Sequence, residues 1–540
     1  KEGPSERFAE QVIATGYIGL SRRYGSYMDE TPELIIEDTL DTIGRSLMGI
    51  TLRCARCHDH KYDPVTTKDY YALYGLFAST TYPFPGSEKS PRQQRLFAVV
   101  PPDEVERLTK PQEKNLTAMR KHIDKSLRTS EAAKKYLAWK TKADNLLGEI
   151  NALESKGKDA AELRDQLRRI DLHASRNYAL TEVTTLELKI HEIETKLGLV
   201  RAYAVEEGQV IDAKIQKSGN PTRWGPRIQR GFPEFIQLKK PPNIPAASSG
   251  RLQLARWFTS PDHPLTARVM VNRIWQWHFG KPLVATPSNF GIRGTPPTHP
   301  KLLDWLAVDF VEGGWSIKRL HRKIVLSKTY RLASESNPDN QVIDPGNRWY
   351  WRFDRNRLDA EAIRDAMLQA SGKLDETRPG PHPFPARVNY KFSQHNPFQA
   401  VYPSMHRSVY LMTQRFKRHP FLALFDGPDT NVSTAKRRTS TVPLQALYLM
   451  NNEFVRARAG EFADRLLKEA KNDSRRLSLA HLATWGRLPN EMERRKATEY
   501  LDRFMKAPAS KEKSGRQREE EAWTSYARIL FCANEFVYID

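Results

Sequence analysis

The stretch TPELIIEDTLDTIGRSLMGITLRCARCH, residues 31–58, decides the fold class of the chain. Its apolar side chains recur at intervals close to the helical period, at Leu34, Ile36, Leu40, Ile43, Leu47 and Ile50. This pattern is typical of an amphipathic helix that buries one face. Thr31 and Pro32 suit the N-cap and the first helical position, so we expect a helix to begin there.

A second helical pattern follows in TTKDYYALYGLFAST, residues 66–80. Its larger apolar residues share one helical face: Tyr70, Leu73, Tyr74 and Phe77. These side chains would either cover a group held between the two helices or form an ordinary aromatic core. We therefore predict a helical N-terminal domain over residues 1–80.

Three further segments are distinguished by composition and period. Residues 103–200 have apolar residues three or four apart in a background of Lys and Glu, which predicts a helical hairpin that turns at Gly157. Residues 201–248 alternate like short strands between Gly and Pro turns, which predicts a small β-containing connector. Residues 249–540 return to helical spacing without an internal repeat, which predicts a larger globular helical domain. The predicted fold class is mainly α.

The net charge limits the classes of partner. The 540 residues include 86 Lys and Arg against 64 Asp and Glu, a formal charge of +22. Such a field attracts nucleic acid, anionic lipid, anionic polysaccharide or acidic proteins. No nucleic-acid recognition module is found, so we expect no nucleic-acid partner. No apolar run reaches the length of a membrane span, so we expect no transmembrane segment.

Cys54, Cys57 and His58 form a C-x-x-C-H pattern, which is the attachment motif of c-type haem. Cysteines three residues apart lie on the same side of a helical turn, where both thiols can form thioethers with the haem vinyl groups. The histidine that follows can then bind the iron. The motif predicts haem c as the cofactor, with His58 as a ligand of the haem iron.

Two other interpretations of this segment stay open. The cysteines could form a disulfide or remain a reduced pair, whereas a zinc site would need a second cysteine pair. Alternatively, Asp59, His60 and Asp63 could bind a divalent metal through oxygen and nitrogen atoms. If haem is bound, Met28 and Met48 are candidates for its second axial ligand.

A basic run forms a candidate anion site in the C-terminal half. Lys436, Arg437 and Arg438 precede a helix that is expected to begin at Pro443. Cations beside the backbone donors of a helix N-terminus suit a sulfate, a carboxylate or a haem propionate. A solvated basic turn would have the same sequence.

The loop TPSNFGIRGTPPTHP, residues 286–300, is a candidate functional loop that carries Arg293 and His299. Long loops on a rigid helical scaffold often bear function, although a structural Ω-loop is equally consistent with this composition. The sequence contains no G-x-S-x-G, P-loop, G-x-G-x-x-G or H-E-x-x-H pattern, which excludes several common enzyme classes. It leaves open whether the chain is an enzyme.

Two long stretches resemble known domains. Residues 44–80, GRSLMGITLRCARCHDHKYDPVTTKDYYALYGLFAST, resemble a domain of unknown function in secreted, cytochrome-c-like planctomycete proteins. Residues 267–331, which include NRIWQWHFGKPLVATPSNFGIRGTPPTHPKLLDW, resemble the domain that follows it in those proteins. The second resemblance continues in NRWYWRFDRNRLDAEAIRDAMLQASGKLD, RSVYL and STVPLQALYLMNNEFV. The helical segment at 103–200 is outside the resemblance.

The resemblance implies a bacterial protein exported to the periplasm or cell envelope. In that family the paired domains usually follow a cytochrome c module, so the chain resembles an N-terminally truncated member. The implied function is electron transfer linked to complex polysaccharide degradation, with a redox protein or the upstream module as partner and anionic polysaccharide as a further candidate. The alternative is a glycan-active enzyme or polyanion-binding protein in which the C-x-x-C-H turn is a structural disulfide or metal site.

Overall fold

The computed structural model describes residues 4–19, 21, 32–83, 96–129, 131–155, 160, 162–163, 166–167, 183–380, 402–413, 418–507 and 514–539. The described chain is mainly helical, which confirms the predicted fold class. It forms two compact units. The first contains the described residues of 1–272 and 284–315, and the second contains those of 273–283 and 316–540.

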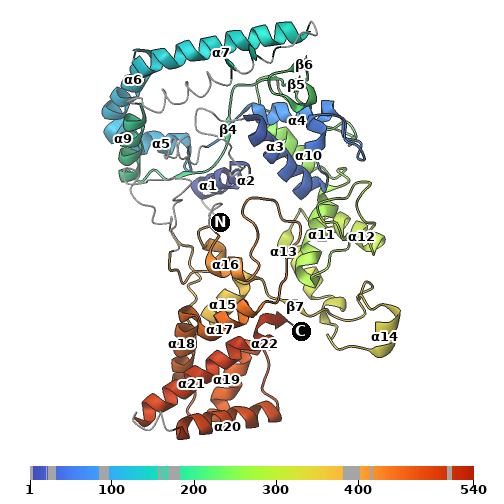
Figure 1. Ribbon diagram of the computed structural model, residues 1–540, viewed down its shortest axis with the longest axis vertical. Helices are drawn as coiled ribbons and strands as arrows, with labels where there is room; N and C mark the ends of the chain where they lie inside the picture. The colour runs from blue at the N-terminus through green and yellow to red at the C-terminus, as the bar shows by residue number, and fades with distance from the viewer. Residues whose placement is uncertain are drawn as a thin grey trace. The chain divides into compact units, whose positions relative to one another are not determined.

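Helices make up most of both units (Figure 1). The first unit contains α1 (Pro4–Ala14), α2 (Gly16–Gly19), α3 (Pro32–Ile43), α4 (Thr67–Ala78), α5 (Pro102–Thr109), α6 (Glu113–Thr129), α7 (Glu131–Ser155), α9 (Val183–Lys196), α10 (Arg251–Phe258) and α12 (Pro300–Glu312). Helix α11 (Thr266–Phe279) contributes residues to both units. The second contains α13 (Ile317–Val325), α14 (Pro338–Ile343), α15 (Ala360–Ala370), α16 (Pro420–Leu424), α17 (Pro443–Asn451), α18 (Glu453–Glu469), α19 (Asp473–Trp485), α20 (Glu491–Lys506), α21 (Gly515–Cys532) and α22 (Asn534–Val537).

The described strands are short and pair two by two in antiparallel fashion. The pairs are β1 (Thr80–Thr81) with β4 (Glu206–Glu207), β2 (Phe97–Ala98) with β3 (Arg201–Ala202), β5 (Lys214–Gln216) with β6 (Trp224–Arg227), and β7 (Asn356–Arg357) with β8 (Tyr538–Ile539). Four of these strands lie within residues 201–248, where the sequence predicts a small β-containing connector. Among the described residues, no helix is both long enough and apolar enough to cross a membrane.

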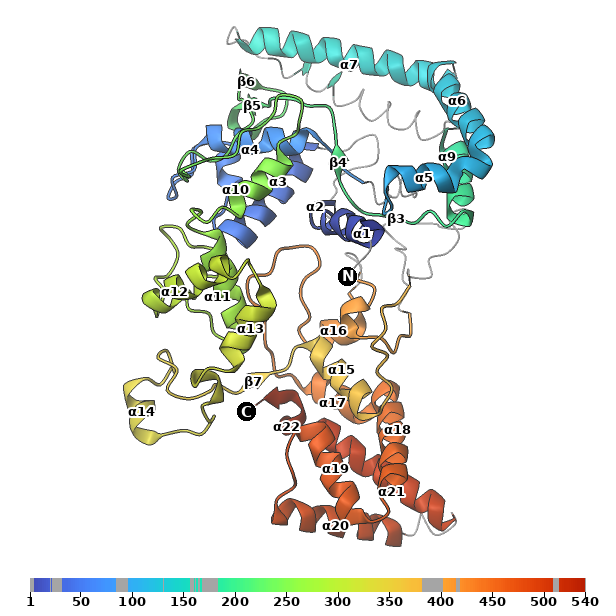
Figure 2. The same cartoon turned by 180° about the vertical axis from the view of Figure 1, so that it is seen from behind.

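Helices α3, α4 and α10 form the core of the first unit and lie together in both views (Figures 1 and 2). Leu40, Tyr70, Leu76 and Trp257 are almost completely buried in it. Helix α4 begins after Thr66, because Thr66 and Asp69 form a capping box in which each side chain accepts a hydrogen bond from the backbone N–H of the other. The aromatic face of α4 is therefore a packed core.

The first predicted helix ends earlier than its apolar spacing suggests. Helix α3 stops at Ile43 and continues as a single π-helical turn, Gly44–Met48. Gly49 then adopts a left-handed conformation, with φ 62°, and its N–H bonds to the carbonyl of Gly44. A glycine in this conformation is a common helix terminator. The cysteine motif consequently lies on a separate 3₁₀ turn, Arg53–Arg56, whereas the expected cap Thr31 lies outside the described residues.

The segment at 103–200 is helical where it is described, as predicted. Strand β2 lies just before this segment and β3 just after it, and the two strands pair. The segment therefore begins and ends at the same place in the unit. Helix α6 packs against α9, and the buried carboxylate of Glu194 accepts hydrogen bonds from Arg120 and Arg201. The expected turn at Gly157 lies outside the described residues.

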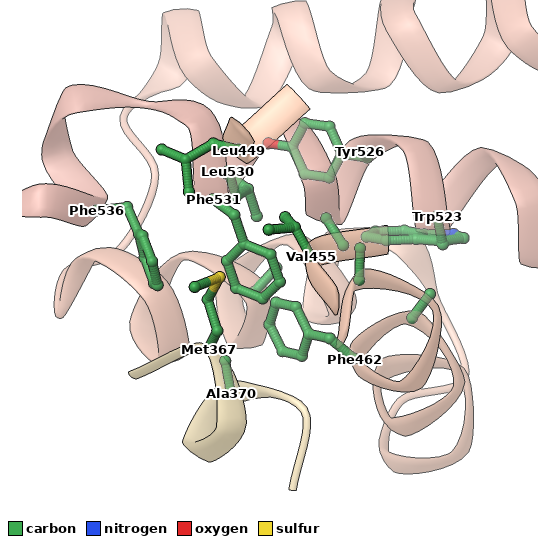
Figure 3. Close-up of a cluster of buried hydrophobic side chains, with 14 of the residues drawn as sticks. Met367, Ala370, Leu449, Val455, Phe462, Trp523, Tyr526, Leu530, Phe531 and Phe536 are labelled. Carbon is green, nitrogen blue, oxygen red and sulfur yellow. The ribbon is translucent and has the colours of Figure 1, made fainter. Parts of the chain in front are cut away.

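Helices α15, α17, α18, α19 and α21 enclose the core of the second unit. Phe462 of α18 stacks against Phe531 of α21, with ring centroids 5.8 Å apart. Met367 and Val455 lie next to this aromatic pair (Figure 3). This apolar core holds the unit together because all four side chains are completely removed from water.

The first prediction concerns this core. We expect Phe462→Ala to lower the free energy of unfolding of the second unit by about 3–5 kcal/mol, since it removes a buried ring and leaves a cavity. Hydrogen exchange of the α21 amides measures the loss. Leu444→Ala is the matched control, because Leu444 is 64% exposed and should change stability by less than about 0.5 kcal/mol. Equal exchange in both variants would contradict this description of the core.

His263 gives the first unit a sensitivity to acid. Its ring is buried against Trp257, and Nδ1 accepts a hydrogen bond from the backbone N–H of Thr266, at the start of α11. Burial lowers the pKa of His263 to about 4. Because this pKa is below the ordinary value, the folded state binds its proton less readily than the unfolded state does. The stabilisation of the folded state by neutral His263 is fully present above about pH 6.5 and is lost as the pH falls towards 4.

We therefore expect His263→Asn to reduce the pH dependence of folding. Asparagine retains an acceptor for the Thr266 N–H but does not titrate. Between pH 7 and pH 5 the wild type should lose about 2 kcal/mol more than the variant, measured by urea unfolding. If the free energy of unfolding fell equally in the wild type and in His263→Asn, His263 would not be protonated on unfolding.

Candidate functional site

The C-x-x-C-H motif presents its reactive groups to solvent. Cys54 and Cys57 are exposed and their thiols are free, and His58 is also exposed. The two intervening residues point the other way: Ala55 is fully buried and Arg56 is 8% exposed. In a 3₁₀ turn, residues three apart lie above one another, so this arrangement places both thiols on the outer side. All three predicted attachment residues are thus exposed to solvent.

Arg56 holds this turn in place from within. Its guanidinium donates hydrogen bonds to Glu37 of α3, to the side chain of Gln216 at 3.2 Å and to the carbonyl of Gly219 at 3.0 Å. Burial alone would lower the pKa of Arg56, but the hydrogen bond and charge of Glu37 outweigh it and raise the pKa. The hydroxyl of Tyr71 donates to the Arg56 carbonyl at 3.1 Å. The turn is therefore fixed to α3, α4 and the β5–β6 hairpin.

The tip of the β5–β6 hairpin lies against Cys57. Gly219 has φ 72°, and a β-carbon at this position would collide with Cys57 Sγ. Only glycine combines this backbone conformation with so close an approach. The hairpin consequently covers one side of the Cys57 thiol, and the Gly219 carbonyl is held there by Arg56.

His58 and Asp59 fix the end of the motif. His58 Nδ1 lies 2.7 Å from the Asp59 carbonyl oxygen, so in the neutral ring Nδ1 carries the proton and donates it. Nε2 of His58 is then an available acceptor. The Asp59 carboxylate accepts the backbone N–H of Thr67 at 2.7 Å, in the first turn of α4. Asp59 therefore ties the motif to the helix that follows.

His60 and Asp63 organise the rest of the turn. His60 Nδ1 accepts the backbone N–H of Asp63 at 2.9 Å, so its proton is on Nε2, which donates to the Thr51 hydroxyl at 3.1 Å. The backbone N–H of His60 donates to the carbonyl of Val65 at 2.8 Å. Both side chains are buried, and Asp63 Oδ1 accepts the backbone N–H of Ile292 at 2.9 Å.

The loop predicted to be functional docks onto this turn. The backbone N–H of Phe290 donates to the Gly49 carbonyl at 2.6 Å, and a β-carbon at Gly49 would collide with the Phe290 ring. A β-carbon at Gly291 would likewise collide with the Asp63 carboxylate. Arg293 lies over the ring of Tyr62, 5.1 Å from its centroid. The loop and the cysteine turn therefore form one continuous structure.

The alternative metal ligands already have protein partners. Asp59 bonds to α4, His60 to Thr51 and Asp63 to Ile292. Within the described ranges, no group of three or more His, Cys, Asp or Glu side chains is placed to hold a metal ion. Of the two candidates for a second axial ligand, Met48 is completely buried in the core, and Met28 lies outside the described residues.

The predicted anion site is part of an ion-pair cluster in the second unit. Arg437 binds Glu361 in a two-pronged contact and lies 3.6 Å from Asp359. Burial opposes the charge of Arg437, but the hydrogen bond to Glu361 outweighs it and raises the pKa of Arg437. Lys436 and Arg438 are exposed on either side. Two carboxylates therefore offset the charge of the central cation.

His299 is the residue immediately before α12, and its Nδ1 lies 3.0 Å from the Thr298 hydroxyl. It contributes to the start of this helix, whereas Arg293 of the same loop reaches the cysteine turn.

Sequence reasoning did not identify Arg56, Gly49, Gly219 or Gly291. Gly49 and Gly291 give a usable signal, because each lies in or beside a stretch that the sequence singles out and permits close backbone contact, whereas Gly219 is 162 residues from Cys57. Arg56 gives none, since charged residues between two cysteines are usually expected to be exposed.

Two family models match the chain. Residues 2–82 match PSCyt2, a protein of unknown function (DUF1549), and residues 250–501 match PSD1, a protein of unknown function (DUF1553). The cysteine turn lies in the first match and the docked loop in the second, so the contact between them joins two regions recognised by separate models. No curated protein and no solved structure matches the chain. Residues 2–82 and 250–501 are thus similar to two families whose function is unknown.

The docking contact can be tested at Asp63. Asp63→Ala removes the buried carboxylate that accepts the Ile292 N–H, and a hydrogen bond to a charged group contributes about 1.5–3 kcal/mol. We expect exchange of the Ile292 amide to accelerate about 10- to 100-fold, as measured by hydrogen exchange. Asp63→Asn retains an oxygen acceptor and should preserve most of the protection. Unchanged protection in the alanine variant would show that this bond does not hold the loop.

Proposed function

We propose that the chain is an exported c-type-cytochrome-like protein that binds haem at Cys54, Cys57 and His58 and transfers electrons. The observation that carries the proposal is the orientation of the motif: both thiols and the imidazole face outward from a turn held by the buried Arg56. Residues with this chemistry and spacing suit covalent attachment and iron binding. The cytochrome-related name of the matching model PSCyt2 is consistent with this assignment.

The residues fit the chemistry of the cofactor. The thiols of Cys54 and Cys57 are free to form thioethers, and Nε2 of His58 is free to bind iron. The Asp59 carbonyl holds the other ring nitrogen, which fixes the orientation of the imidazole, as partners of ligating histidines commonly do. A haem bound there would supply one-electron transfer.

The surroundings limit where that cofactor would lie. The space behind the turn is filled by Ala55, the Arg56–Glu37 pair and Tyr71. The described core is therefore complete without haem, and the attachment side is the solvent side. Buried Met48 is on the core side, so we assign no second axial ligand from this part of the chain.

The biological setting is part of the proposal. A protein of this kind would act in the periplasm or cell envelope, exchange electrons with a redox protein or an upstream cytochrome c module, and support the breakdown of complex polysaccharides. The charge of +22 is suited to an anionic partner.

A second candidate function follows from the way the turn is held. Arg56, Asp59 and Asp63 secure it entirely through protein contacts, which a purely structural turn also requires. In that case the chain would be a glycan-active enzyme or a polyanion-binding protein, and the exposed Lys436 and Arg438 would be candidates for contact with an anion.

Covalent haem attachment distinguishes these functions. The chain should be expressed in a host that performs cytochrome c maturation and then analysed by haem-stained denaturing gel and pyridine haemochrome spectrum. We expect covalent haem in the wild type, a single thioether in Cys54→Ala or Cys57→Ala, and none in the double variant. Cys532→Ala is the matched control and should stain like the wild type. Folded, unstained wild-type protein would favour the second function.

A further inference from the structure

The outer surface around the cysteine motif combines cations with exposed apolar groups. Arg53 precedes Cys54, and its side chain is 67% exposed. Lys61 and Arg293 are also exposed, and both lie over the Tyr62 ring, at 5.5 Å and 5.1 Å from its centroid. Tyr62 follows His58 by four residues, so their Cα atoms are at most about 14 Å apart. One cation therefore adjoins the motif directly, and two more lie at Tyr62, four residues beyond it.

The anionic groups of this region are mostly turned inward. Glu37 and Asp63 are buried, and Glu37 is shared by Arg53 and Arg56. The exposed carboxylate of the turn is Asp59, which bonds to the first turn of α4. On the adjacent face of α4, Lys68 is paired with Glu234. The solvent side of the motif consequently carries an excess of positive charge.

We infer that Arg53, Lys61, Tyr62, Ile292 and Arg293 form the docking surface for an acidic protein that exchanges electrons at the motif. The inference rests on the proposed haem function for the electron step and on the surface alone for the docking. One electron would pass from the donor protein to the bound iron, so that the donor is oxidised and the iron reduced by the same amount.

The composition of this surface favours a protein over an anionic polysaccharide. The Ile292 side chain is 73% exposed although its backbone is fixed by Asp63, and Tyr62, which contacts the neighbouring Arg293, is 42% exposed. Aromatic and Arg side chains dominate the energetic centres of protein interfaces, whereas a charged rim steers the encounter. An anionic polysaccharide presents mainly charges and hydroxyl groups, so it would gain little by covering the exposed aliphatic side chain of Ile292.

Binding of a defined acidic protein tests the docking without requiring haem. We would measure the affinity of oxidised flavodoxin, an acidic one-electron carrier, for the chain with and without haem. Lys61→Glu/Arg293→Glu should weaken binding at least about 10-fold at low ionic strength, and the difference should shrink in high salt. Lys471→Glu/Arg475→Glu makes the same charge change at exposed positions of the second unit and should alter affinity less than about twofold.

Alkylation of the thiols measures the electrostatic potential at the motif, independently of flavodoxin binding. In haem-free protein, the ratio of the rate with anionic iodoacetate to the rate with neutral iodoacetamide at Cys54 and Cys57 should fall several-fold in Lys61→Glu/Arg293→Glu. Cys532 is the internal reference and should not change. Equal ratios in both proteins would show that these cations do not act on the motif and would overturn the surface assignment.

The remaining outcomes separate this inference from the haem proposal. Flavodoxin affinity unchanged by Lys61→Glu/Arg293→Glu, with heparin retention lost more than in the control variant, would assign the surface to polysaccharide and overturn the inference. Weakened flavodoxin binding in a protein that never acquires haem would retain the docking surface but refute the electron step. Weakened binding together with at least about 10-fold slower haem reduction by photoreduced flavodoxin would support both.

Discussion

The burial of one guanidinium determines how the cysteine motif is presented. Arg56 lies between the two cysteines, and its ion pair with Glu37 keeps it inside the first unit. If the turn rotated to expose Arg56, the buried carboxylate of Glu37 would lose this partner, which is costly. The turn therefore cannot readily rotate. Because the opposite side of the turn then faces solvent, Cys54 and Cys57 point outward, and His58, which follows the turn, is exposed as well. Everything proposed about haem depends on this orientation.

Close backbone contacts extend the same constraint to distant parts of the chain. Gly219 lets the β5–β6 hairpin reach Cys57, and Gly49 and Gly291 let the 286–300 loop reach the turn. Asp63 secures that loop through the N–H of Ile292. These contacts unite the region matched by PSCyt2 with the loop of the region matched by PSD1. The exposed Arg293 and Ile292 are consequently part of the surface that surrounds the motif.

Local sequence patterns predicted the mainly helical fold, because the helical period depends on short-range spacing. The aromatic face of α4 follows from residues 66–80 alone, whereas its capping residues, Thr66 and Asp69, were not predicted. The early end of α3 was missed, since the apolar spacing continues past Gly49 while the backbone there turns left-handed. The role of Asp63 was missed for a different reason: its partner Ile292 is 229 residues away, and the acidic side chain resembled a metal ligand. Tertiary contacts of this kind leave no local period.

The central claim is that the protein itself, without a cofactor, builds the turn that presents the motif. The most direct test is the circular dichroism spectrum and thermal unfolding curve of the chain produced without haem, in a host that lacks cytochrome c maturation. Our account predicts a helical spectrum and a cooperative transition, because Arg56, Asp59 and Asp63 find their partners within the chain. A haem-free chain that is largely unfolded would contradict it and would show that the cofactor forms part of the core.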